Sequence, residues 1–92
     1  DPLRLVAETV RAESRDYSRP TALAGLAEPP FQLVRSELAF VLAQVTQSQG
    51  AGDIRSCTAS NGAVYLYSSD YLTDLHARRL AEFYAVEVWQ NP

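Results

Sequence analysis

The sequence contains no lysine and no methionine, and it has one cysteine and one histidine in 92 residues. The lone Cys57 cannot form an internal disulfide, which is typical of a reducing compartment, so we expect a cytoplasmic protein. Because the single histidine has no partner in an H-x-x-x-H or C-x-x-C pair, we expect no metal site. The lack of lysine is typical of GC-rich coding, and we expect a bacterial protein.

Several larger motifs are also missing. There is no G-x-G-x-x-G, no Walker loop and no G-x-S-x-G, which are the motifs that usually indicate nucleotide binding and hydrolase chemistry. We therefore expect no cofactor, no catalytic residues and no enzymatic activity. No apolar run approaches the roughly 20 residues of a membrane span, and no secretory signal is visible at the N-terminus, which predicts no membrane association.

The charge of the chain is small and dispersed. All eight basic residues are arginine, the formal net charge is −3, and only Arg78 and Arg79 are adjacent. A nucleic-acid-binding surface normally gathers basic residues into a patch or stripe. The charge pattern therefore does not favour nucleic acid as a partner.

The composition is that of a folded domain, with 47% hydrophobic and 21% charged residues. A chain of this length has room for a single core, so residues 1–92 are predicted to form one domain. The sequence starts at Asp1, which is typical of a helix N-cap, rather than at an initiating methionine. We expect the domain to be excised from a longer chain.

Apolar residues at helical spacing predict three helices, and a fourth, short one fits the connector between the first two. The last helix is capped by Thr73 and is expected to bury Leu75, Leu80 and Phe83 or Tyr84. Alternation of apolar residues after it suggests a short C-terminal strand. The predicted helices span Pro2 to Ser14, Thr21 to Ala27, Val34 to Gln47, and Asp74 to Tyr84.

A β-hairpin is predicted from Ile54 to Ser68, turned at Asn61-Gly62. This dipeptide favours a two-residue type I′ turn, which pairs Cys57 with Leu66 and Thr58 with Tyr65. The resulting core face holds Cys57, Ala59, Val64 and Leu66, and the opposite face holds Ser56, Thr58, Tyr65 and Tyr67. Ile54 falls on the tyrosine face, so either a bulge lies between Ile54 and Cys57 or a neighbouring element covers that end of the hairpin. Ile54 is the residue most able to show that this register is wrong.

The predicted fold is therefore α+β, with three or four helices and one hairpin. The order helix, short helix, helix, hairpin, helix resembles a winged-helix domain over about Asp1 to Tyr84. The resemblance implies that the helix from Val34 to Gln47 reads DNA and that the hairpin is the wing. Its DNA-contacting candidates are Arg35, Gln44, Gln47 and Arg55.

Two kinds of candidate site remain. Cys57 with His76 as its base could form a nucleophilic pair, but Cys57 lies among apolar neighbours, where a thiol is normally inert. The tyrosine face offers aromatic side chains of the kind enriched at protein interfaces, or these rings pack beneath the C-terminal segment. We expect a non-catalytic protein-interaction or assembly module that binds a protein partner or a second copy through Tyr65, Tyr67, Tyr71 and Trp89, with a winged-helix DNA-binding regulator as the alternative.

Overall fold

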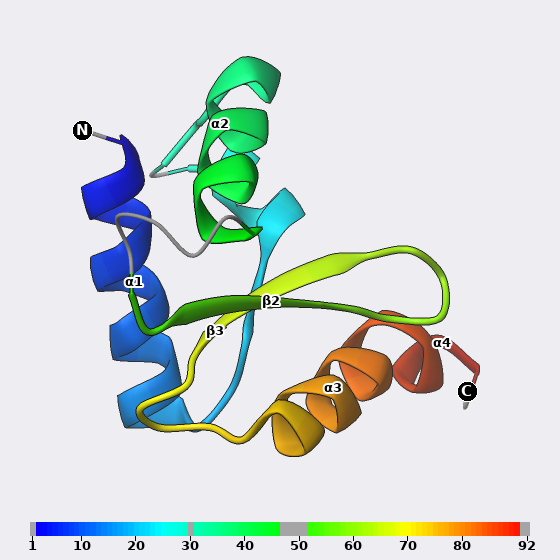
Figure 1. Ribbon diagram of the computed structural model, residues 1–92. Helices are drawn as coiled ribbons and strands as arrows, with labels where there is room; N and C mark the ends of the chain where they lie inside the picture. Colours follow the sequence, from blue (N-terminus) through cyan, green and yellow to red (C-terminus); the bar gives the residue numbers. More distant parts are fainter. Residues whose placement is uncertain (1, 30, 47–51, 91–92) are drawn as a thin grey trace.

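The computed structural model describes residues 2–29, 31–46 and 52–90. It confirms the α+β class, with helices at both ends of the chain and a three-stranded antiparallel sheet between them (Figure 1). The elements are α1 (Pro2–Tyr17), β1 (Thr21–Ala22), the 3-10 helix η1 (Leu23–Ala27), α2 (Arg35–Thr46), β2 (Ile54–Thr58), β3 (Val64–Ser68), α3 (Asp74–Glu82), the π-helical turn η2 (Phe83–Glu87) and α4 (Val88–Gln90).

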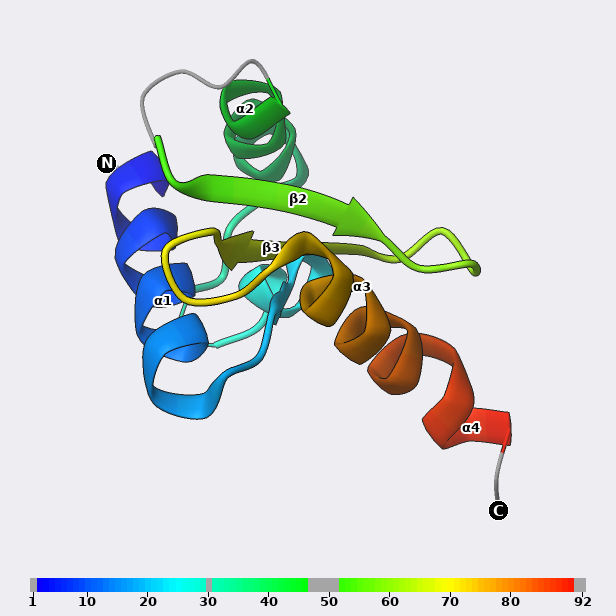
Figure 2. The ribbon, with the colours of Figure 1, turned by 60° about the horizontal axis from the view of Figure 1, so that its bottom comes forward.

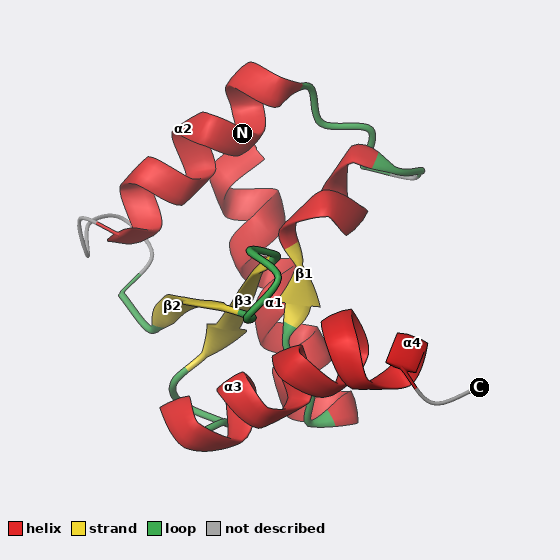
Figure 3. Ribbon diagram, turned by 90° about the vertical axis from the view of Figure 1, so that its right-hand side faces the viewer, coloured by secondary structure: helices red, strands yellow, loops and turns green. Residues whose placement is uncertain are grey.

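The sheet has the strand order β1-β3-β2, so the central strand β3 pairs with both of its neighbours. Helices cover both of its faces: α2 lies on one side and α3 on the other (Figure 3), and α1 shares a hydrophobic cluster with α2. Each layer has its own hydrophobic cluster. Because both faces of β3 are covered, four of its five residues are buried.

The hairpin turn differs from the predicted one by a single residue. The Gly62 amide donates to the Ala59 carbonyl at 2.9 Å, and the Ala59 amide donates to the Ala63 carbonyl at 2.9 Å. The loop is therefore Ser60-Asn61-Gly62, with a positive φ of 91° at Gly62 but no positive φ at Asn61. This is the geometry of a three-residue hairpin that ends in a glycine bulge, in place of a type I′ turn.

The extra loop residue shifts the register of the hairpin. Cys57 lies opposite Tyr65, and Ile54 lies opposite Ser68. A shift of one residue changes which side chains of the two strands share a face. Ile54 and Leu66 therefore face α1 and α2, while Cys57, Tyr65 and Tyr67 face α3. The predicted core face of Cys57 and Leu66 together was wrong, and Ile54 was the residue that signalled the error.

The chain after α3 stays helical, so the predicted C-terminal strand was wrong. No proline or glycine interrupts residues 74–90, and the helix continues through η2, where the Val88 amide donates to the Phe83 carbonyl five residues back. The start of α3 is as predicted, because the Thr73 hydroxyl accepts a hydrogen bond from the His76 amide at 3.1 Å. In Figure 2 the end of this helix extends beyond the sheet.

Candidate functional site

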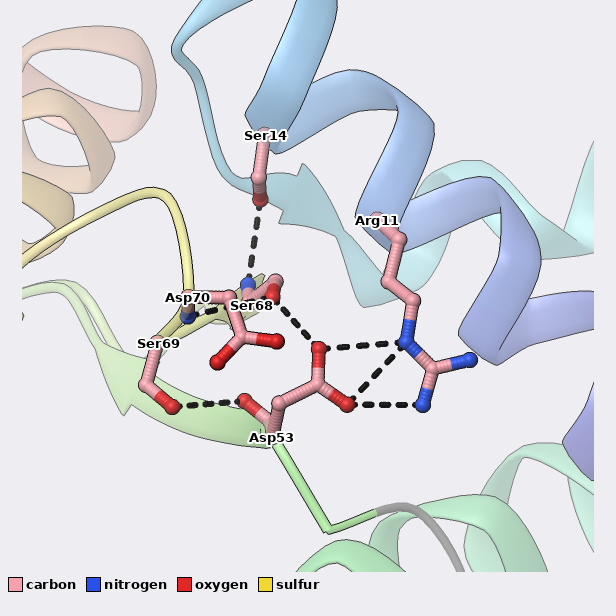
Figure 4. A network of polar contacts seen from close by, with 6 residues as sticks. All are labelled: Arg11, Ser14, Asp53, Ser68, Ser69 and Asp70. Atoms are coloured by element: carbon pink, nitrogen blue, oxygen red, sulfur yellow. Dashed lines mark hydrogen bonds and ion pairs between the residues drawn. The ribbon is translucent and has the colours of Figure 1, made fainter.

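A polar network joins α1 to the open end of the hairpin, where β2 begins and β3 ends (Figure 4). Asp53, just before β2, accepts from the Arg11 guanidinium, with Nη2 at 2.6 Å and Nε at 3.0 Å from Oδ1. Its other oxygen accepts from the Ser68 hydroxyl at 2.5 Å. The Ser68 amide in turn donates to the Ser14 hydroxyl of α1 at 3.0 Å. These contacts fix the end of β3 against both α1 and β2.

The charge state of this network argues for a structural role. Hydrogen bonds from Arg11, and a further one from Ser68, lower the pKa of Asp53 to about 2. A carboxylate with so low a pKa is a poor general base near neutral pH. The Ser68 side chain is fully buried, so no substrate can reach its hydroxyl. The Asp53–Ser68 pair is therefore a buried clamp and does not have the properties of a nucleophilic site.

The pair of Cys57 and His76 does not assemble. Cys57 is buried beneath α3, and burial raises the pKa of its thiol, which keeps the sulfur protonated. His76 is exposed on α3 and donates its backbone amide to the Thr73 cap. Within the described residues no group of three or more histidine, cysteine, aspartate and glutamate side chains could hold a metal ion.

The predicted tyrosine surface is covered by α3. Tyr65 and Tyr67 are 8% and 4% exposed and pack in the cluster that contains Ala77 and Ala81 of this helix. The Tyr67 hydroxyl donates to Asp74 at 2.9 Å, and burial together with this bond raises the pKa of Tyr67 to about 12. The prediction that these two rings contact a partner was therefore wrong for this fold, and their role is to seat α3.

The large apolar side chains of the C-terminal helix face outward instead. The tyrosine rings already fill the space above the sheet, so the closest approach of α3 is made by alanines at positions 77 and 81. Leu75 is 62% exposed and Trp89 is 80% exposed, opposite to the predicted inward orientation of Leu75. We call the resulting group the C-terminal apolar surface; it consists of Leu75, Phe83, Tyr84, Val88 and Trp89.

This surface includes one of the four predicted interface residues, Trp89. Tyr71 is also exposed, at 49%, and lies in the turn before α3. Leu75, Phe83 and Tyr84 were missed, because large apolar residues at helical spacing are ordinarily assigned to the core. Val88 was missed because it was assigned to the predicted C-terminal strand. The available signal was the pair of alanines at 77 and 81, which share the other side of the same helix.

Helix α2 is apolar on two sides. Val41 and Val45 are buried against the first cluster, yet Phe40 is 51% exposed, with Ala39 and Ala43 also on the outer side. A helix that is apolar all round is normally covered all round. The outer side of α2 therefore presents the large apolar side chain of Phe40 to solvent.

The DNA-contacting candidates do not converge on one surface. Arg35 is exposed at the start of α2, and Gln44 is half-buried. Arg55 is exposed on β2 but shares the face of Tyr67, which is the face covered by α3 and not the one covered by α2. Gln47 lies outside the described residues.

Together these features define the class of protein: an α+β domain whose hairpin is packed between an N-terminal helical layer and a C-terminal helix. Residues 1–89 match the family described as the YdhW C-terminal domain, so the chain belongs to that family. It is 32% identical over 92 residues to the uncharacterized protein YdhW of Escherichia coli (strain K12), covering 100% of this chain and 43% of that relative. The chain thus spans less than half the length of the curated relative it matches.

No solved structure matches the chain. None of the described helices is long and apolar enough to cross a membrane.

Proposed function

We propose that this domain is a non-catalytic protein-interaction module that assembles through its C-terminal apolar surface, with a second copy of the chain as the partner. One observation carries the proposal: the C-terminal helix buries alanines and presents Leu75, Phe83 and Trp89 to solvent. Large exposed apolar side chains are found at interaction sites of soluble proteins, and aromatic residues dominate the energetics of such sites.

Two further features support an interface at this position. The Phe83 and Tyr84 rings contact each other edge to face, with centroids 5.6 Å apart, so they form a preorganised aromatic pair. They also lie on the π-helical turn η2, a feature that is rare in helices and frequent at functional sites. Holding the rings in place before binding reduces the conformational entropy lost on association.

Sedimentation velocity over a range of concentrations tests the assembly. We expect the wild-type chain to show concentration-dependent dimerisation and Trp89→Ser to raise the dissociation constant at least about tenfold, the size expected when an interface loses an aromatic anchor. Tyr17→Ser is the matched control, because Tyr17 is also exposed, at 67%, but lies at the end of α1. A wild-type chain that stays monomeric at high concentration would contradict assembly with a second copy.

The alternative function is that of a winged-helix DNA-binding regulator. The order of elements favours it, because α1, η1 and α2 precede the hairpin as the helices of a winged-helix domain precede its wing. Against it, the outer side of α2 presents Ser36, Ala39, Phe40 and Ala43, and Arg35 at the start of the helix is its one basic residue. A single arginine supplies few of the base and phosphate contacts that a DNA-reading helix makes. A protein is therefore favoured over DNA as the partner.

Titration of duplex DNA at two salt concentrations separates the two functions. Binding driven by phosphate contacts weakens steeply as salt rises, because counterions are released. We expect no salt-sensitive binding, since the chain has a net charge of −3 and its exposed arginines are dispersed. Micromolar binding that falls at least tenfold between the two salt concentrations would instead support the DNA-binding regulator.

A further inference from the structure

The C-terminal helical segment, residues 74–90, has two opposite stripes of side chains. The inner stripe packs in the hydrophobic cluster between α3 and the hairpin, and it consists of Ala77, Ala81 and Ala85. Positions two residues away lie on the other side of a helix, because each residue turns the chain by about 100°. The outer stripe is exposed along its whole length and consists of Leu75, Arg79, Phe83 and Glu87.

The π-helical turn η2 keeps the outer stripe straight. In an α-helix of 3.6 residues per turn, every fourth residue lies about 40° past the one before, so a stripe of such residues winds around the helix. The hydrogen bond of η2 runs from the Val88 amide to the Phe83 carbonyl, so four residues do not complete this wider turn. Glu87 thereby returns to the side of the helix that carries Arg79.

The outer stripe carries one positive and one negative charge, and neither has a partner within residues 2–29, 31–46 and 52–90. The other charged side chains of the segment are already bonded. Arg78 Nε lies 2.8 Å from Asp74 Oδ2, and the Glu82 carboxylate accepts two hydrogen bonds from Ser60. The side chains of Arg79 and Glu87 are therefore available to a partner.

These two charges are placed symmetrically about Phe83, four residues to either side of it. Two copies of the segment that cross antiparallel at Phe83 bring Arg79 of each copy opposite Glu87 of the other. Phe83 lies close to the middle of residues 74–90, so the two segments overlap over almost their whole length. A parallel pair would set Arg79 against Arg79 and Glu87 against Glu87, and like charges that meet across an interface oppose association.

We propose that two copies of this domain associate antiparallel through the outer stripe, with Phe83 on the two-fold axis and an Arg79–Glu87 ion pair on each side of it. The inference rests on the proposed function and adds the orientation of the partner and the residues that select it. A two-fold interface must be complementary to itself, and the charge pattern of this stripe meets that requirement. The same arrangement carries Leu75 of one copy toward Trp89 of the other.

Charge reversal tests the ion pairs, with sedimentation velocity of the 92-residue chain as the measurement. We expect Arg79→Glu and Glu87→Arg each to raise the dissociation constant of the dimer at least about tenfold, because each change turns two attractive contacts per dimer into two repulsive ones. Arg35→Glu is the matched control, since it makes the same change of charge at an exposed position at the start of α2. It should leave the dissociation constant unchanged.

The two reversed chains should recover when they are mixed. A dimer of one Arg79→Glu chain and one Glu87→Arg chain again has an opposite-charge pair on each side of Phe83, so we expect a dissociation constant close to that of the wild-type dimer. Recovery also shows that both variants are folded. Mixing Arg35→Glu with Glu87→Arg gives the same net charges but retains an Arg–Arg contact, so this mixture should not recover.

The possible failures are distinct. A wild-type dimer that is weakened by Trp89→Ser but unaffected by both charge reversals overturns the antiparallel pairing and leaves the proposed function in place. Tighter binding of Arg79→Glu to the wild-type chain than to Glu87→Arg indicates a parallel dimer and also overturns the inference. A wild-type chain that stays monomeric overturns the proposed function and, with it, the antiparallel pairing.

Discussion

Leu66→Ala is expected to lower the free energy of unfolding by about 3 to 4 kcal/mol, within the range measured for leucine-to-alanine changes in buried cores. Leu66 is fully buried in the middle of β3, the strand that pairs with both β1 and β2. It faces α1 and α2 in the first hydrophobic cluster. Its truncation leaves a cavity at the point where the sheet and both helices meet, and a small domain has little stability to spare.

Leu75→Ala is the matched control, because it is the same substitution at a residue that is 62% exposed. It should change the free energy of unfolding by less than about 0.5 kcal/mol. Urea denaturation of the wild-type chain and both variants measures the difference. Equal losses for the two variants would contradict the observed orientation of α3, since they would place Leu75 in the core as the helical spacing alone suggests.

Asp53→Asn is expected to destabilise the domain by up to about 2.5 kcal/mol at pH 7, at roughly 1.4 kcal/mol for each unit between the ordinary aspartate pKa and the folded value of about 2. This is an upper bound, because the Arg11 side chain is 41% exposed and water screens part of the attraction. Asparagine still accepts from Ser68, so the variant removes mainly the charge.

The pH dependence gives the sign of this effect. The folded-state pKa of Asp53 is lowered, so its stabilisation is fully present above the unfolded pKa near 4 and is lost as pH falls to about 2. The wild-type and Asp53→Asn chains should therefore converge in stability between pH 4 and pH 2, measured by urea denaturation at each pH. Asp16→Asn is the control: Asp16 pairs with its neighbour Arg15 at the exposed end of α1 and should give no measurable change. A gap between wild type and Asp53→Asn that persists at pH 2 would exclude the ion pair as its source.

The elements of this fold could be predicted from local patterns, because each depends on spacing or capping within a few residues. Helical spacing placed α1 and α2, Thr73 marked the start of α3, and Asn61-Gly62 located the hairpin. The register of the hairpin could not be fixed in this way. A two-residue and a three-residue loop both suit a glycine at position 62, and the choice depends on which faces the two helical layers cover.

The candidate sites depended on tertiary contacts and were less predictable. Tyr65 and Tyr67 have the composition of an interface, but their exposure depends on α3, which closes over them. Trp89 and Tyr71 are exposed, and their place at a protein interface stays a prediction. A pocket at the edge of the sheet is lined by residues of α1, β1, η1, β3 and η2, which come together only when the chain folds. No spacing in the sequence marks such a site.

The hairpin tip is tied to the C-terminal helix at two places. The Ser60 amide and hydroxyl both donate to the Glu82 carboxylate, at 2.8 Å and 2.6 Å, and the Asn61 side chain donates to the Ala85 carbonyl at 3.2 Å. The hairpin loop and the C-terminal helix are therefore held together by three hydrogen bonds. A partner that binds the C-terminal helix at Phe83 or Trp89 therefore meets a helix that is already held to the hairpin tip, so its binding surface is positioned by the sheet as well as by the helix itself.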